Sequence, residues 1–198
     1  MIDQRLIDNN TVHAQQSIVS RQPTSSSSLW LIRNIFDTCI LEKLKCYIDA
    51  TADTDWAWRG GGGNPLRKSI MWEADSVIEE LHTVCGNLTK LVQKELCTPD
   101  IEFMAIQLWK DSAGFNMSWH VDKPVIHVAL QIYLLDSPEN YGTTFDTGTE
   151  VLTVPHVHNT GYMAFNNIRH RITSPVIEGT IRYSFYAIWK LKEGNETC

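Results

Sequence analysis

The sequence predicts one α+β domain in which two amphipathic helices brace an antiparallel sandwich or jelly roll of short strands. Its 198 residues suit a single domain, and the hydrophobic residues, 43% of the chain, are enough for a sizeable core. The hydrophobic period changes from helical to alternating after Pro99. Helices therefore come first in the chain and strands second.

The first 28 residues are predicted to be a flexible arm. They are polar and end in a serine-rich run at residues 24–28. Such a composition cannot bury enough apolar surface to offset the entropy lost on ordering. The domain itself is expected to span residues 29–198.

Two helices are expected next. Asp37 suits an N-cap, and apolar residues recur at helical spacing from there to Ile48. A second apolar stripe runs from Val77 to Leu96 and should pack on the sheet that follows. Between them lies a glycine loop, Gly60–Gly63. It lacks the Gly-Lys-Ser/Thr of a phosphate loop, so we interpret it as a mobile segment and hypothesise that it forms a lid.

The second half of the chain carries at least five strand-like runs, each rich in β-branched and aromatic residues and bounded by Gly, Pro, Asn or Asp. The runs are 101–109, 126–135, 150–154, 162–165 and 181–189.

Charge and cysteine content narrow the class of protein. The formal net charge is −6 and no basic run occurs, which disfavours a nucleic-acid partner. Five cysteines without a CxxC pair indicate reduced thiols. No signal peptide and no apolar run of membrane-spanning length is found, so a soluble, cytoplasmic protein without a membrane partner is expected.

Candidate metal ligands occur around Trp119. His120 and Asp122 are two residues apart, and in an extended segment they share one face. His170 opens another strand-like segment and completes a set of two imidazoles and one carboxylate. This is the facial triad of non-haem iron(II), which leaves coordination positions open. The residues alone equally allow ordinary hydrogen-bonded histidines.

Arg182 is the candidate anion-binding residue. It shares a strand face with Ser184, between apolar neighbours. A buried guanidinium needs an anion, and its planar fork suits a carboxylate.

The order of these residues resembles the iron(II)/2-oxoglutarate-dependent oxygenase superfamily, in its prolyl-hydroxylase-like branch. That family has His-x-Asp, a distal His, and an Arg or Lys about ten residues further on. Further similarity lies in 114–122 (GFNMSWHVD), in 131–134 (QIYL) followed by 142–145 (GTTF), and in 170–184 (HRITSPVIEGTIRYS). The similar region covers residues 101–190. One glycine of the family's Gly-Gly-x-Thr turn is replaced, and many collagen-type enzymes have Lys at the position of Arg182.

The resemblance implies a double-stranded β-helix core at about 101–190, buttressed by the N-terminal helices. It also implies a dioxygenase that hydroxylates an unactivated C–H bond while decarboxylating 2-oxoglutarate to succinate and CO2, with O2 as the other co-substrate. The substrate would be a small molecule or a peptide or protein, with a prolyl or other amino-acid side chain as the target. The implied residue roles are iron(II) ligation by His120, Asp122 and His170, and 2-oxoglutarate binding by Arg182, Ser184, Tyr133 and Gln107.

Other residues are assigned structural roles. His156 and His158 are interpreted as part of an exposed polar loop rather than a second metal site, and His127 as a core or rim histidine. Five aromatic residues are candidates for a pocket mouth but are assigned to the core, where aromatic residues of a small sandwich are more often found; they are Trp56, Trp58, Trp109, Trp119 and Tyr133.

Two alternatives stay open. One is a jelly-roll module that binds a ligand or partner without catalysis. The other is a cupin-like metalloenzyme that does not use 2-oxoglutarate, for which His156-x-His158 fits the opening motif but no Glu at cupin spacing is evident. Dependence on 2-oxoglutarate separates these readings from the dioxygenase.

Overall fold

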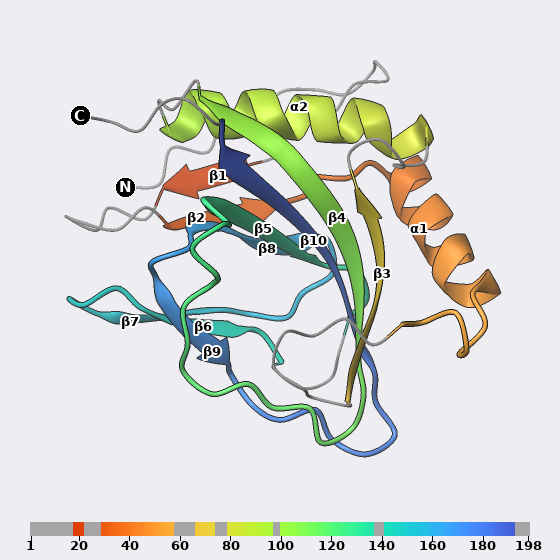
Figure 1. The fold of residues 1–198 in the computed structure, drawn as a ribbon. Coiled ribbons are helices and arrows are strands. Elements are labelled where there is room, and N and C mark those ends of the chain that lie inside the picture. The colour runs from red at the N-terminus through yellow and green to blue at the C-terminus, as the bar shows by residue number, and fades with distance from the viewer. Residues whose placement is uncertain are drawn as a thin grey trace.

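A computed structural model describes residues 18–21, 29–57, 66–73, 79–96, 100–136 and 141–192. Two antiparallel sheets face each other, and two helices cover the outer face of the larger one (Figure 1). The larger sheet has the strand order β1-β2-β8-β5-β10-β4-β3, and the smaller has the order β7-β6-β9. The predicted α+β double-stranded β-helix is confirmed.

The elements have the following bounds: β1 (Ile18–Arg21), β2 (Leu29–Arg33), α1 (Thr38–Ala50), β3 (Arg67–Glu73), α2 (Glu79–Leu96), β4 (Ile101–Asp111), β5 (Val128–Tyr133), β6 (Thr143–Asp146), β7 (Val151–Val154), β8 (Thr160–Phe165), β9 (Arg169–Ile172) and β10 (Arg182–Leu191).

Both predicted helices form, and their apolar stripes meet the larger sheet. The N-cap of α1 is Asp37, whose carboxylate accepts a hydrogen bond from the Ile40 amide at 2.8 Å. Leu44 of α1 and Leu88 of α2 are buried in one core cluster that includes the helix-facing side of the sheet. The indole of Trp189 on β10 also donates a hydrogen bond to the Thr89 hydroxyl of α2, at 2.9 Å. In the described part of the chain, no helix has the length and apolar character needed to cross a membrane.

Side-chain alternation gives the larger sheet two unlike faces. On β4, Ile106 and Leu108 belong to the core beneath the helices. Gln107, Trp109 and Asp111 point the other way, into the space between the two sheets. The sheet thus separates an apolar helix-facing core from an inner face that carries polar groups beside smaller apolar clusters.

Five strands of the structure lie outside the predicted strand runs, namely β1, β2, β3, β6 and β9, although β9 coincides with the strand-like segment expected at His170. The expected arm also differs in part, because Ile18–Arg21 pair with β2 as an edge strand. The glycine loop Gly60–Gly63 with its neighbour Trp58 lies outside the described residues, as do Cys97 and Cys198. Cys39, Cys46 and Cys85 are free thiols.

Candidate active site

Backbone pairing brings the three predicted metal ligands together. His120 and His170 exchange backbone hydrogen bonds of 3.0 and 2.8 Å, which join the segment after β4 to β9. Asp122 follows two residues later, and its amide donates to the carbonyl of Asn166 at 3.1 Å. One potential ligand atom from each of His120, Asp122 and His170 lies within 4.8 Å of the others.

Both imidazoles are oriented for coordination. Nδ1 of His120 lies 2.9 Å from the Ser118 carbonyl, and Nδ1 of His170 lies 2.9 Å from the Ile168 carbonyl. A carbonyl can only accept, so each Nδ1 carries a proton and Nε2 is the ring nitrogen left to meet a metal. Nε2 of His170 is 3.9 Å from Oδ1 of Asp122. Carbonyl partners of this kind fix the tautomer and ring orientation of metal-binding histidines.

The electrostatics of His170 suit a neutral ligand. Burial lowers the pKa of its imidazole, and the charge of Asp122 opposes that effect only in part. Tyr186 donates a hydrogen bond of 3.3 Å to Oδ2 of Asp122 and thereby orients the carboxylate. The donor set of two imidazoles and a carboxylate fits iron(II).

A cavity of about 480 Å³ opens beside this cluster. His120, Asp122 and His170 line it, as does Arg182. The volume lies in the range typical of small-molecule sites. Trp109 also lines it, stacked on Tyr186 with ring centroids 4.1 Å apart.

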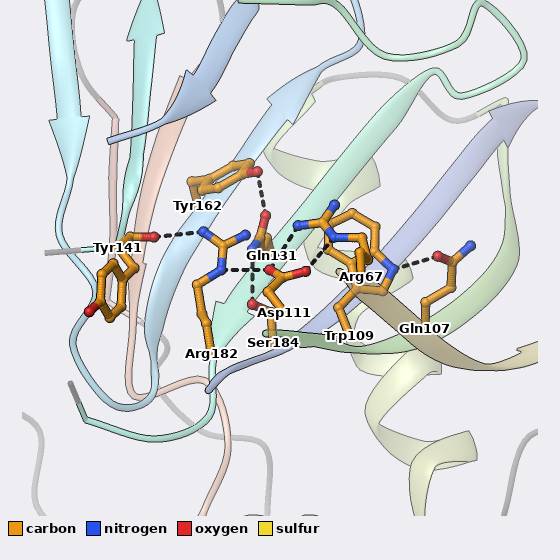
Figure 2. Close-up of polar contacts among 9 residues, drawn as sticks. All are labelled: Arg67, Gln107, Trp109, Asp111, Gln131, Tyr141, Tyr162, Arg182 and Ser184. Atoms are coloured by element: carbon orange, nitrogen blue, oxygen red, sulfur yellow. Dashed lines mark hydrogen bonds and ion pairs between the residues drawn. The ribbon is translucent and has the colours of Figure 1, made fainter. Parts of the chain in front are cut away.

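Arg182 is buried, as expected, but it already has an anionic partner within the protein. Its Nε donates to Oδ2 of Asp111 at 2.8 Å, and its Nη1 donates to the Tyr141 carbonyl at 2.6 Å (Figure 2). Asp111 is also bound by Arg67, with Nε to Oδ1 at 2.5 Å and Nη2 to Oδ2 at 2.9 Å. Arg67 lines the cavity too. Sequence reasoning identified neither Arg67 nor Asp111, because no local motif marks them.

The three further residues predicted to bind the co-substrate divide into two groups. Gln107 lines the cavity, and its Oε1 accepts the Trp109 indole N–H at 2.6 Å. Ser184 and Tyr133 are fully buried behind the described cavity wall. Their hydroxyls bond to side chains that do line it, Ser184 to Gln131 at 3.0 Å and Tyr133 to Thr143 at 2.8 Å.

Gln131 is therefore a wall residue that the sequence analysis missed. Its amide nitrogen donates to Ser184, and its carbonyl accepts the Tyr162 hydroxyl at 2.7 Å (Figure 2). The sequence could have identified Gln131, because residues two apart on a strand share a face and Tyr133, two residues later, was already a candidate.

The expectation of an exposed loop at His156 and His158 is wrong for His156. Its side chain is buried, with the ring 4.7 Å from that of Tyr133 and 6.2 Å from that of Tyr141, whereas His158 is exposed. Burial, together with the positive charge of Arg182, lowers the pKa of His156 to about 4. The neighbouring aromatic rings account for the burial of His156, and this burial is the main cause of its lowered pKa.

The remaining candidates take ordinary positions. His127 is half-buried against Phe165, with ring centroids 5.2 Å apart. Trp56 belongs to the helix-side core. Trp119 is half-buried and contacts the guanidinium of Arg171, 4.9 Å from its ring centroid.

Comparison with solved structures decides the fold. A Pseudomonas putida prolyl-4-hydroxylase superposes with a TM-score of 0.67 and 11% identity, over 85% of this chain and 95% of that one. The fold is that of the iron(II)/2-oxoglutarate oxygenases. The nogalamycin-biosynthesis epimerase SnoN, solved with Fe3+, α-ketoglutarate and nogalamycin RO, gives a TM-score of 0.65 and 14% identity, over 82% of this chain and 78% of that one.

A third matching structure is HygX from Streptomyces hygroscopicus, with nickel and 2-oxoglutarate bound. It has a TM-score of 0.58 and 9% identity, and 84% of each chain is covered. No protein-family model matches the sequence, and no curated protein matches it significantly. These structures and this chain share a fold although most of their residues differ.

Proposed function

We propose that this protein is an iron(II)/2-oxoglutarate-dependent dioxygenase that hydroxylates an unactivated C–H bond. The observation that carries the proposal is the pair His120 and His170, whose carbonyl-bound Nδ1 atoms leave both Nε2 atoms free beside Asp122 at the wall of a cavity. The oxygenase fold and the buried Arg182 in the same cavity support it.

The residues take distinct roles. His120, Asp122 and His170 would hold iron(II), and Tyr186 would keep the Asp122 carboxylate in place. When bound, the iron and 2-oxoglutarate supply the oxidising power, with conversion of the keto acid to succinate and CO2. The protein contributes position, charge and exclusion of water.

The co-substrate would bind toward the arginine end of the cavity. Arg182 would pair with its distal carboxylate, since Nη2 of Arg182 has no hydrogen-bond partner among the described residues. Gln107 and Gln131 flank Tyr186 on the sheet that carries Arg182, and they would form the cavity wall beside it. Ser184 and Tyr133 would act from behind this wall through Gln131 and Thr143. The last two assignments differ from the direct contacts expected from the sequence.

The proposed substrate is a prolyl or other amino-acid side chain, free or within a protein. The fold-level similarity to the Pseudomonas putida prolyl-4-hydroxylase supports this choice. SnoN shares the fold and is an epimerase, so the substrate needs its own test. That test measures 2-oxoglutarate-dependent succinate formation with free proline and with proline-containing peptides, and mass spectrometry detects a product gain of one oxygen.

An anaerobic titration tests the dioxygenase assignment. Metal-free protein receives iron(II) and then 2-oxoglutarate, and the visible charge-transfer band of the chelated keto acid is followed. We expect a saturating band in the wild type and none in His170→Ala. Iron binding without a band would support a metalloenzyme that does not use 2-oxoglutarate. Absence of iron binding would support a non-catalytic ligand-binding module.

A further inference from the structure

Arg67, Asp111 and Arg182 form one row across three neighbouring strands. Asp111 on β4 is the direct register partner of Arg67 on β3 and of Arg182 on β10. All three side chains are buried, with relative exposures of 8%, 0% and 3%. Figure 2 shows the Asp111 carboxylate between the two guanidinium groups.

The row carries an unbalanced positive charge. Burial alone would raise the pKa of Asp111, but the two arginines together lower it below its ordinary value, so the group is a carboxylate. One carboxylate neutralises one of two guanidinium groups. A buried cation without a counter-ion is costly, so the site favours binding of an anion.

The free donors face the cavity that an anion would enter. Arg67 and Arg182 both line it, whereas Asp111 does not. Nη1 of Arg67 and Nη2 of Arg182 make no hydrogen bond to any residue that the structure describes. The Arg67 guanidinium is also held rigidly, 3.9 Å from the Trp109 ring centroid and 4.2 Å from that of Phe115.

This arrangement changes what Arg182 can do alone. Because Asp111 is bonded to Arg182 at 2.8 Å, the attraction of Arg182 for a second carboxylate is largely cancelled. Arg67 restores that attraction, since it is bonded to the other side of the same carboxylate.

The charge balance also indicates which anion is bound. Iron(II) with Asp122 carries one net positive charge, and the arginine row carries another. A 2-oxoglutarate dianion neutralises both, with one carboxylate at each end. Among the described residues of the proposed metal cluster and the arginine row, no unpaired buried positive charge is then left to bind an anionic substrate.

We propose that Arg67 is a second co-substrate-binding residue, which supplies the positive charge that Asp111 cancels on Arg182 and so enables this cavity to bind the distal carboxylate of 2-oxoglutarate. This inference rests on the proposed function. It makes Asp111 a positioning residue that joins the two arginines.

The test measures binding of 2-oxoglutarate to manganese(II)-loaded protein by isothermal titration calorimetry, so that no turnover is required. Arg67→Met should weaken 2-oxoglutarate binding roughly 10- to 100-fold while manganese affinity stays unchanged. The double variant Arg67→Met/Asp111→Asn removes one charge of each sign and should recover most of the lost affinity. Arg171→Met is the matched control, because Arg171 lines the cavity but is exposed and outside the row.

Each outcome has one meaning. Normal 2-oxoglutarate binding by Arg67→Met would overturn the role of Arg67 and leave the dioxygenase assignment intact. Failure of the double variant to recover would overturn the charge argument. Absence of 2-oxoglutarate binding by the wild type would refute the proposed function itself. If Arg67→Met does not fold, Arg67→Gln keeps a hydrogen-bond donor for Asp111, and the same loss is expected.

Discussion

The phenol of Tyr186 donates a hydrogen bond of 3.3 Å to Oδ2 of Asp122, which connects strand β10 to the predicted metal cluster. Burial and the nearby charge of Asp122 raise the pKa of Tyr186 well above its ordinary value, so the phenol remains a donor. Arg182 lies on the same strand face, four residues earlier. One strand therefore carries side chains at both the proposed metal end and the proposed co-substrate end of the cavity.

Tyr186→Phe tests this connection. The ring can still stack on Trp109, but Asp122 loses its orienting partner, so metal affinity should fall about tenfold. Manganese(II) or cobalt(II) titration measures the change. Tyr183→Phe is the control, because Tyr183 is on the opposite face of β10 beside the helix-side core. Equal metal affinities in the wild type and Tyr186→Phe would contradict the orienting role.

Single removal of the metal ligands should abolish metal binding and leave the fold intact. In His120→Ala, Asp122→Ala and His170→Ala, the affinity should fall by more than about 100-fold, beyond what loss of an orienting partner costs. Near-ultraviolet circular dichroism should stay native, because backbone atoms join the two histidine segments. His127→Ala should bind metal normally, because the His127 side chain is not among the described residues that line the cavity.

Gly161 has no room for a side chain. A Cβ there would lie 1.7 Å from the Gln131 carbonyl oxygen, between paired strands β5 and β8. Gly161→Ala should lower the free energy of unfolding by more than about 3 kcal/mol in urea denaturation. Gly86→Ala is the matched control on α2, where a Cβ meets nothing within 4 Å. It should stabilise the protein by about 1 kcal/mol, so a similar loss in both variants would argue against the clash.

Because of His156, the free energy of unfolding should decrease in mild acid. In the folded state its pKa is about 4, against about 6.5 when unfolded, because of burial and then the charge of Arg182; Asp136 and Asp111 oppose this. Between pH 6.5 and 4, His156 is protonated in the unfolded chain but not in the folded chain. The free energy of unfolding therefore decreases as the pH falls toward 4. The free energy of unfolding should drop by roughly 3 kcal/mol across this window.

Urea denaturation of wild type and His156→Phe at several pH values measures this contribution. The difference between the two curves should shrink or change sign between pH 6.5 and 4. His158→Gln, at an exposed position, should follow the wild type throughout. A pH-independent difference between wild type and His156→Phe would refute the assignment.

The sequence predicted those features that local spacing encodes. The Asp37 cap and the strand-like runs that form β4, β5 and β10 depend only on neighbouring residues, and they were confirmed. The contact between Arg67 and Asp111 joins residues 44 positions apart through the register of β3 and β4, which no local pattern specifies. Burial of His156 likewise depends on where the rings of Tyr133 and Tyr141 lie.

The metal ligands illustrate the same division. The two-residue spacing of His120 and Asp122 was visible in the sequence, but the orientation of each imidazole depends on carbonyls of the folded backbone. Arg182 was identified by its position, whereas its bond to Asp111 was not. Residue type and order thus predicted which side chains gather at the proposed site, and tertiary pairing determined its charge balance.

The two-faced alternation of β4 limits how this protein can change during evolution. Substitution of Gln107 or Trp109 alters the cavity without touching Leu108, which serves the helix-side core. Insertion of a single residue into the strand would exchange the faces beyond it, placing polar groups under the helices and apolar groups in the cavity. Point substitutions on the cavity face can therefore change the site and leave the core intact, whereas a one-residue insertion is tolerated only where a bulge absorbs it, as at the register shift opposite Ile188 and Trp189.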